Sequence, residues 1–114
     1  MILQQTDNYI KACMQTWLLC ESCIHAEENS FDPRESLIAK CRTCAYSCFA
    51  VVSRIVSKEE VEMQESALIC LLNCRECYME CEKYNYIDDI DYCGEMCLFC
   101  ADILQELAMP IYLN

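Results

Sequence analysis

The amino-acid sequence predicts an all-α protein, an antiparallel up-down-up-down four-helix bundle whose core is lined with cysteine side chains. Three observations support this fold class. The 114 residues include one glycine and two prolines, which leaves few residues suited to tight β-turns. The thirteen cysteines fall in four runs and recur within each run every three, four or seven residues, which is the repeat of one helix face. The connections expected between the runs are short, so consecutive helices should be antiparallel neighbours.

The first two helices are bounded by recognisable capping residues. Asn29 and Ser30 are expected to close the first helix. Asp32, Pro33 and Glu35 then supply an N-cap, a first helical residue and a third helical residue for the second helix. The cysteines carried by these helices are Cys13, Cys20 and Cys23 in the first, and Cys41, Cys44 and Cys48 in the second.

The third and fourth helices begin with similar signals. Ser57 and Glu60 form a capping box before the third helix. Asp88, Asp89 and Asp91 place negative charge at the positive dipole end of the fourth, so that connections are expected near residues 29–32, 56–58 and 84–88. The cysteines carried here are Cys70, Cys74, Cys77 and Cys81 in the third helix, and Cys93, Cys97 and Cys100 in the fourth.

An antiparallel bundle brings all thirteen cysteines into the same part of the molecule. At about 100° per residue, each run projects within an arc of roughly 80° and can face one shared interior. The cysteines lie toward the end that carries the connections near 29–32 and 84–88, because they are late in the first and third helices and early in the other two. The same faces continue toward the opposite end as an expected hydrophobic plug of Ile2, Tyr9, Val52, Ile55, Met63, Ala67, Leu104 and Leu107.

Composition and charge limit the function classes. The 55% hydrophobic content suits one small domain, residues 1–114. A net charge of −11 offers no basic patch for nucleic acid, and no apolar stretch reaches the roughly 20 residues that cross a bilayer. The first residues, MILQQTDNY, show no export signal, so we expect a cytoplasmic protein with free thiols rather than disulfides. The sole histidine, His25, has no evident nucleophile partner, and we expect no enzymatic activity.

A thiol-lined core predicts a site for soft metal ions. Thirteen cysteines in place of larger residues would pack poorly if they served only as hydrophobic filling. Thiolates select Cu(I), zinc and iron–sulfur clusters. A zinc ion with four thiolates carries net charge −2, whereas Cu(I) bound at about one ion per sulfur is neutral and can be buried. The sequence therefore favours multiple Cu(I) ions per chain, with a zinc-binding or thiol-redox module holding few metals as the alternative.

One motif suggests an iron–sulfur cluster. Residues 93–100 spell CxxxCxFC, which resembles the cluster motif of radical S-adenosylmethionine enzymes. Those enzymes carry the motif on a loop of a partial (β/α) barrel, whereas here it falls inside an expected helix. This context favours the helix-face interpretation of the three cysteines.

The paired cysteines also resemble those of a known family, the bacterial cysteine-rich copper storage proteins, in its cytosolic branch. The resemblance covers the whole chain and rests on CxxxC pairs at Cys44/Cys48, Cys70/Cys74, Cys77/Cys81 and Cys93/Cys97. It implies a four-helix bundle that binds many Cu(I) ions, usually as a homotetramer, with all thirteen cysteines as metal ligands. Some members place Met or His where copper enters. Here Met96 flanks the cysteine face, while His25 is expected to face solvent.

The expected partners are copper ions, a copper chaperone or other exchange partner, and further copies of the chain. Leu68, Leu72 and Met79 form an apolar stripe opposite the cysteines of the third helix. A lone monomer would leave this stripe exposed, so the sequence predicts self-association.

Overall fold

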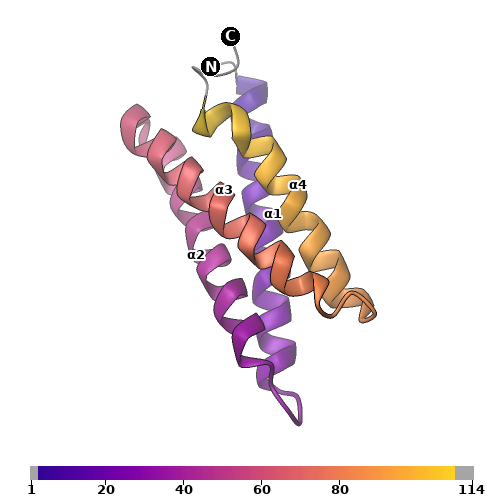
Figure 1. Cartoon of the computed structure of the whole chain (residues 1–114). Helices are drawn as coiled ribbons and strands as arrows, with labels where there is room; N and C mark the ends of the chain where they lie inside the picture. The colour runs from indigo at the N-terminus through magenta and orange to yellow at the C-terminus, as the bar shows by residue number, and fades with distance from the viewer. Residues whose placement is uncertain (1–2, 110–114) are drawn as a thin grey trace.

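The structure confirms the predicted all-α class. The computed structural model describes the backbone of residues 3–109 and the side chains of residues 6–109 (Figure 1). Four helices occupy this range, and it contains no β-strand. They are α1 (Leu3–Glu28), α2 (Glu35–Ser57), α3 (Glu60–Glu82) and α4 (Asp88–Ala108). None of them combines the length and the hydropathy that a membrane span requires.

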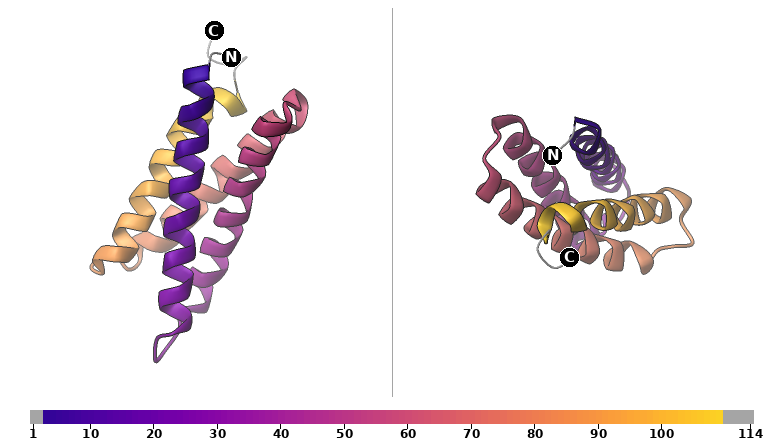
Figure 2. Two further views of the ribbon diagram at one scale, coloured as in Figure 1. Left: turned by 180° about the vertical axis from the view of Figure 1, so that it is seen from behind. Right: turned by 90° about the horizontal axis from the view of Figure 1, so that it is seen from above.

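The four helices surround a common interior. Each packs against its neighbours in the chain, and α1 also packs against α4, which closes the ring (Figure 2). Within the described residues the diagonal pairs, α1 with α3 and α2 with α4, make no comparable contact. Alternate helices run in opposite directions, so the connections at residues 29–34 and 83–87 lie at the same end, the lower end in Figure 1. We call this the loop end.

The predicted close of α1 is confirmed. The side-chain amide of Asn29 donates to the carbonyl of His25 at 2.8 Å, and its backbone N–H reaches the same oxygen at 3.2 Å. The hydroxyl of Ser30 donates to the carbonyl of Glu27 at 2.7 Å. These bonds satisfy carbonyls that the last helical turn leaves without partners.

The predicted start of α2 is wrong by two residues. The helix begins at Glu35 with Arg34 as its N-cap, and Asp32 and Pro33 precede it outside the helix. The backbone N–H of Arg34 donates to the carboxylate of Glu27 at 2.9 Å, and its guanidinium reaches the other oxygen at 3.0 Å. A contact to the preceding helix therefore fixes the extended conformation of Arg34 and overrides the local capping signal.

The predicted capping box before α3 is also wrong. Ser57 belongs to the last turn of α2, where its hydroxyl donates to the carbonyls of Ser53 at 2.9 Å and Arg54 at 3.3 Å. Lys58 then ends α2 in the left-handed conformation, with φ of 59°. The serine hydroxyl bonds back into its own helix, a known alternative to N-capping, and cannot cap α3.

The start of α4 agrees with the prediction. The helix begins at Asp88, and Asp88, Asp89 and Asp91 all lie in its first turn. Their negative charges face the unsatisfied N–H groups at the positive end of the helix dipole.

The end opposite the loop end is closed by apolar side chains, as predicted, and we call these residues the plug. Val51 is fully buried, whereas the predicted Val52 is only half-buried against the core. Ile2 lies outside the described residues. The other predicted members are buried, namely Tyr9, Ile55, Met63, Ala67, Leu104 and Leu107.

Candidate metal centre

The cysteine faces of all four helices point into the bundle. Twelve of the thirteen cysteines are buried, and Cys23 near the loop end is half-buried. All thirteen are free thiols. The helical repeat therefore places the side chains where the sequence predicted, and the structure shows which of them meet.

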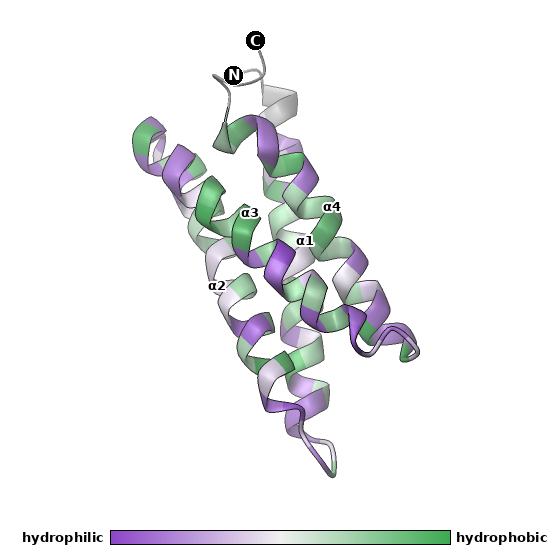
Figure 3. Cartoon of the chain, viewed as in Figure 1, coloured by the Kyte–Doolittle hydropathy of each residue, from purple (hydrophilic) through white to green (hydrophobic). Residues whose placement is uncertain are grey.

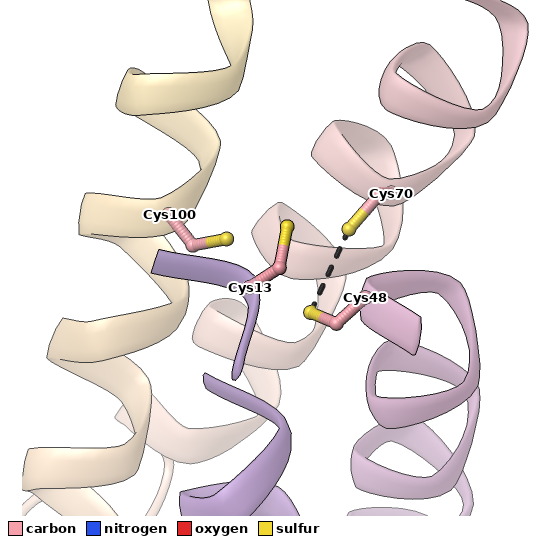
Figure 4. Close-up of side chains that lie close together, drawn as sticks. All are labelled: Cys13, Cys48, Cys70 and Cys100. Atoms are coloured by element: carbon pink, nitrogen blue, oxygen red, sulfur yellow. Dashed lines mark hydrogen bonds between the residues drawn. The ribbon is translucent and has the colours of Figure 1, made fainter. Parts of the chain in front are cut away.

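One group of four thiols lies nearest the plug. Cys13, Cys48, Cys70 and Cys100 come one from each helix, and their sulfur atoms all lie within 4.8 Å of one another (Figure 4). The sulfurs of Cys70 and Cys48 are 3.6 Å apart. Each of the four is fully buried.

A second group of four thiols has the same construction nearer the loop end. Cys20, Cys44, Cys77 and Cys97 again come one from each helix and lie within 4.8 Å of one another. The sulfur of Cys97 is 3.9 Å from that of Cys20 and 3.9 Å from that of Cys44.

Three groups of three thiols join and extend these sets. Five cysteines belong to two groups each, so the groups overlap and form one continuous series along the bundle rather than separate centres. The three groups are Cys44 with Cys48 and Cys74, Cys20 with Cys41 and Cys93, and Cys41 with Cys77 and Cys81. The shared cysteines are Cys20, Cys41, Cys44, Cys48 and Cys77.

The sulfur spacing suits metal bridging. The closest sulfur pairs are 3.6–3.9 Å apart, well beyond the roughly 2.05 Å of a disulfide bond. At a metal–sulfur distance of about 2.3 Å, sulfurs on one ion are about 3.8 Å apart in a tetrahedron and about 4.6 Å apart in a linear pair. Small side-chain rotations cover this range, so the groups can take an ion with two, three or four thiolates.

The core holds no basic side chain that could balance buried negative charge. Among the described residues, the buried polar or charged side chains are Thr16, Glu27, Ser47 and Glu80, and no lysine or arginine is buried. A buried charge without a partner is costly. Metal–thiolate units inside this bundle are therefore favoured when they are close to neutral.

The proton affinities of the thiols differ sharply within the core. Hydrogen bonding with Cys41 and other thiols, together with burial, raises the pKa of Cys20. Hydrogen bonds from Cys20, Cys41 and Cys81 stabilise a thiolate at Cys77 and lower its pKa to about 6. At Cys23 a hydrogen bond with Cys41 acts to lower the pKa. The interaction with Cys93 and burial outweigh this effect and raise the pKa of Cys23 to about 12. Metal uptake must therefore displace protons from at least part of this network.

The two non-cysteine candidates are less buried than the thiols of the sulfur series. His25 is exposed, with its Nδ1 3.5 Å from the side-chain nitrogen of Asn29. Met96 is half-buried. Among the described residues, His25 belongs to none of the groups of close His, Cys, Asp and Glu ligand atoms. Thr16 lies in the core between the cysteines of α1, and its hydroxyl donates to the carbonyl of Ala12 at 2.7 Å.

Sequence reasoning missed the ion pair at the loop end. Glu27 is 6% exposed and pairs with Arg34, whose guanidinium carbon lies 4.9 Å from the ring centre of Tyr84. A signal was present, because Glu27 follows Cys23 by one helical turn and so continues the cysteine face. A carboxylate on that face predicts a buried partner.

Fold and site together define a class, the helix bundles whose cores can hold metal ions through clustered thiols. In a comparison with protein families, the chain matches a family model described as Csp, copper storage protein, over residues 2–109. The chain belongs to the copper storage protein family. Comparison with curated proteins and with solved structures gave no match.

Proposed function

We propose that the protein stores Cu(I) in its core, at about one ion per cysteine, with all thirteen cysteines as ligands. The observation that carries the proposal is the overlap of the five thiol groups, in which shared sulfurs link consecutive positions along the bundle. Residues 1–114 act as a single metal-binding domain. Such a store keeps copper away from other thiol and metal sites in the cell.

Charge and ligand sharing favour Cu(I) over zinc. Cu(I) accepts two thiolates and a thiolate can bridge two ions, so equal numbers of ions and sulfurs give a neutral network. Each zinc ion with four thiolates adds a net charge of −2. Two such centres would place about four negative charges in a core that holds no basic side chain among the described residues.

Zinc binding is the second candidate, and the two four-thiol groups are the observation that favours it. They share no residue, and each takes one cysteine from each helix. Two zinc ions would fill them and leave Cys23, Cys41, Cys74, Cys81 and Cys93 as free thiols. The remaining thiols could then serve as a redox module.

Counting bound ions separates the two candidates. The reduced, metal-free protein is titrated anaerobically with Cu(I), and separately with Zn²⁺, against chromogenic chelators, and free thiols are counted in parallel. The storage proposal expects at least ten copper ions withheld per chain, with the thiols disappearing in step. Saturation at one to four copper ions would reject it and support the module with few metals.

Membership of the copper storage protein family supports a storage role rather than an enzymatic one. Storage requires exchange, so we infer that a copper chaperone or another small copper carrier loads or unloads the core. The cytoplasm is the compartment we propose, because reducing conditions maintain the free thiols that the core requires.

We infer that the protein associates with further copies of itself, as the homotetramer that the resemblance implies. The outer face of α3 supports this inference. Leu68, Leu72 and Met79 are exposed by 39%, 51% and 66%, and Ile69 beside them by 56%. Figure 3 shows hydrophobic residues along much of α3 and α4. Sedimentation of the reduced protein should show an oligomer that Leu72→Glu dissociates. A wild-type monomer at micromolar concentration would contradict the proposal.

A further inference from the structure

The two ends of the sulfur series are closed in different ways. Beyond Cys13 and Cys100, the plug contains only apolar side chains and Tyr9. Beyond Cys81 and Cys93 lies the loop end, where Cys23 is the one cysteine that is not fully buried. Cys23 is therefore the cysteine most accessible to an ion that arrives from solvent.

The side chain of Arg34 joins the two connections at the loop end. Arg34, at the end of the 29–34 connection, makes an ion pair of 3.0 Å with Glu27 at the end of α1. Its guanidinium also lies over the ring of Tyr84 in the 83–87 connection, 4.9 Å from the centroid. We call Glu27, Arg34 and Tyr84 the clasp. It links the α1/α2 hairpin to the α3/α4 hairpin across the end of the core.

The clasp is attached directly to the segments that carry the outermost thiols. Glu27 lies one helical turn beyond Cys23, and its negative charge disfavours the Cys23 thiolate. The backbone N–H of Tyr84 donates to the carbonyl of Cys81 at 2.9 Å. A change in the clasp is therefore felt first at these two cysteines.

We propose that Arg34 gates the core: its bridge from Glu27 to Tyr84 covers the loop end, and release of this bridge limits the rate at which Cu(I) reaches Cys23 and the sulfurs beyond it. This inference rests on the proposed storage function and assigns the route and its control. Arg34 is a positioning residue, because it holds the end closed and binds no metal itself.

The clasp is suited to opening because only one of its charged groups is deeply buried. The side chain of Glu27 is 8% exposed and that of Arg34 is 32% exposed, so the guanidinium can move into water without disturbing a helix. Cation–π and ion-pair contacts of this kind exchange readily at a protein surface. Release should therefore be a local motion that leaves the metal capacity unchanged.

The test compares Arg34→Gln with Arg42→Gln. Arg42 forms an exposed ion pair of 3.0 Å with Glu28 near the same end, and no ion pair or cation–π contact among the described residues joins it to the clasp. Both variants remove one positive charge, so any general attraction of cations changes equally. The measurement is the rate of Cu(I) transfer from a chromogenic chelate to the reduced apo protein by stopped flow, with final capacity recorded for each variant.

Arg34→Gln should accelerate uptake about tenfold, which corresponds to about 1.4 kcal/mol, while Arg42→Gln stays near the wild-type rate. Tyr84→Leu, which keeps the ion pair with Glu27, should give a smaller acceleration and remains informative if Arg34→Gln is poorly folded. Equal rates for the wild type, Arg34→Gln and Tyr84→Leu would overturn the gate.

A second measurement tests access without copper. The apo protein is treated with iodoacetamide, and the modified cysteines are identified by peptide mass spectrometry. Cys23 should react first, and faster in Arg34→Gln than in Arg42→Gln, even though loss of a positive charge makes a nearby thiolate less favourable. Equal alkylation rates would reject the gate whatever the copper capacity, whereas a low capacity with faster alkylation would reject the storage function alone.

Discussion

The contact between α3 and α4 at Gly94 allows a quantitative prediction. Gly94 is buried in α4, and a Cβ atom built there would lie 2.8 Å from the Cβ of Cys81. The same atom would meet the sulfur of Cys81 at 3.7 Å and Cδ1 of Tyr78 at 3.8 Å. The Cβ of Cys81 is fixed to its backbone, so the helices themselves must separate to admit a methyl group.

Two effects of Gly94→Ala oppose each other. Alanine stabilises a helix interior by about 1 kcal/mol relative to glycine. Overpacking a buried contact costs typically 1–3 kcal/mol, and here no flexible side-chain end can move aside. We expect the free energy of unfolding to fall by about 1 kcal/mol, which lowers Tm by about 4 °C for a domain of this size.

The assay is denaturant unfolding of the reduced, metal-free protein, followed by far-ultraviolet circular dichroism. A double-mutant cycle with Cys81→Gly supplies the control, because that substitution removes the Cβ that the new methyl group meets. In the Cys81→Gly background, Gly94→Ala should become neutral or stabilising. If Gly94→Ala stabilises the otherwise wild-type protein by about 1 kcal/mol, the close approach of the two helices is refuted.

Three further predictions concern the core. Cys44→Ser should reduce the copper capacity more than Cys93→Ser, because Cys44 belongs to two thiol groups and Cys93 to one. Equal losses of capacity in the chelator titration would argue against shared sulfurs. Copper affinity should fall as the pH is lowered from about 8 to 6, by up to tenfold per pH unit for each displaced proton, because thiols such as Cys20 must ionise to bind. Competition titrations at several pH values measure this dependence. A copper affinity that does not change with pH would contradict the prediction. Leu104→Ala in the plug should lower the free energy of unfolding by about 2–5 kcal/mol and leave the number of bound copper ions unchanged. Denaturant unfolding measures the first quantity and the chelator titration measures the second. A parallel loss of bound copper would mean that the two ends of the bundle are not independent.

Helix-face periodicity was sufficient to predict the core. The repeat of three, four and seven residues placed every cysteine on an inward face, and twelve of the thirteen are buried. Burial follows from the repeat because a side chain's direction on a helix depends only on its position in the sequence. The plug was predicted for the same reason, apart from the exchange of Val51 for Val52 as the fully buried residue.

The boundaries that failed did so where another contact competed with the local signal. Asp32 and Pro33 are good starting residues for a helix, but the bonds from Arg34 to Glu27 hold this segment extended until Glu35. Ser57 bonds back into α2 and cannot cap α3. Neither competing contact can be read from capping preferences alone.

The grouping of the sulfurs could not be predicted from the sequence. Which thiols meet depends on the axial offset and the crossing of the helices, and periodicity fixes only the face. Cys20 lies 3.9 Å from both Cys93 and Cys97, and these distances depend on how far α4 is displaced along α1. The structure supplied this offset, and with it the overlap of groups on which the proposed function rests.

The location of copper in a loaded crystal would test the central claim most directly. Anomalous scattering at the copper absorption edge shows each bound ion and its ligands. The account predicts a continuous row of copper ions between Cys81 and Cys13, coordinated by sulfur and linked by shared cysteines. Copper confined to two separate four-thiol centres, or bound outside the core at His25 or surface carboxylates, would contradict it.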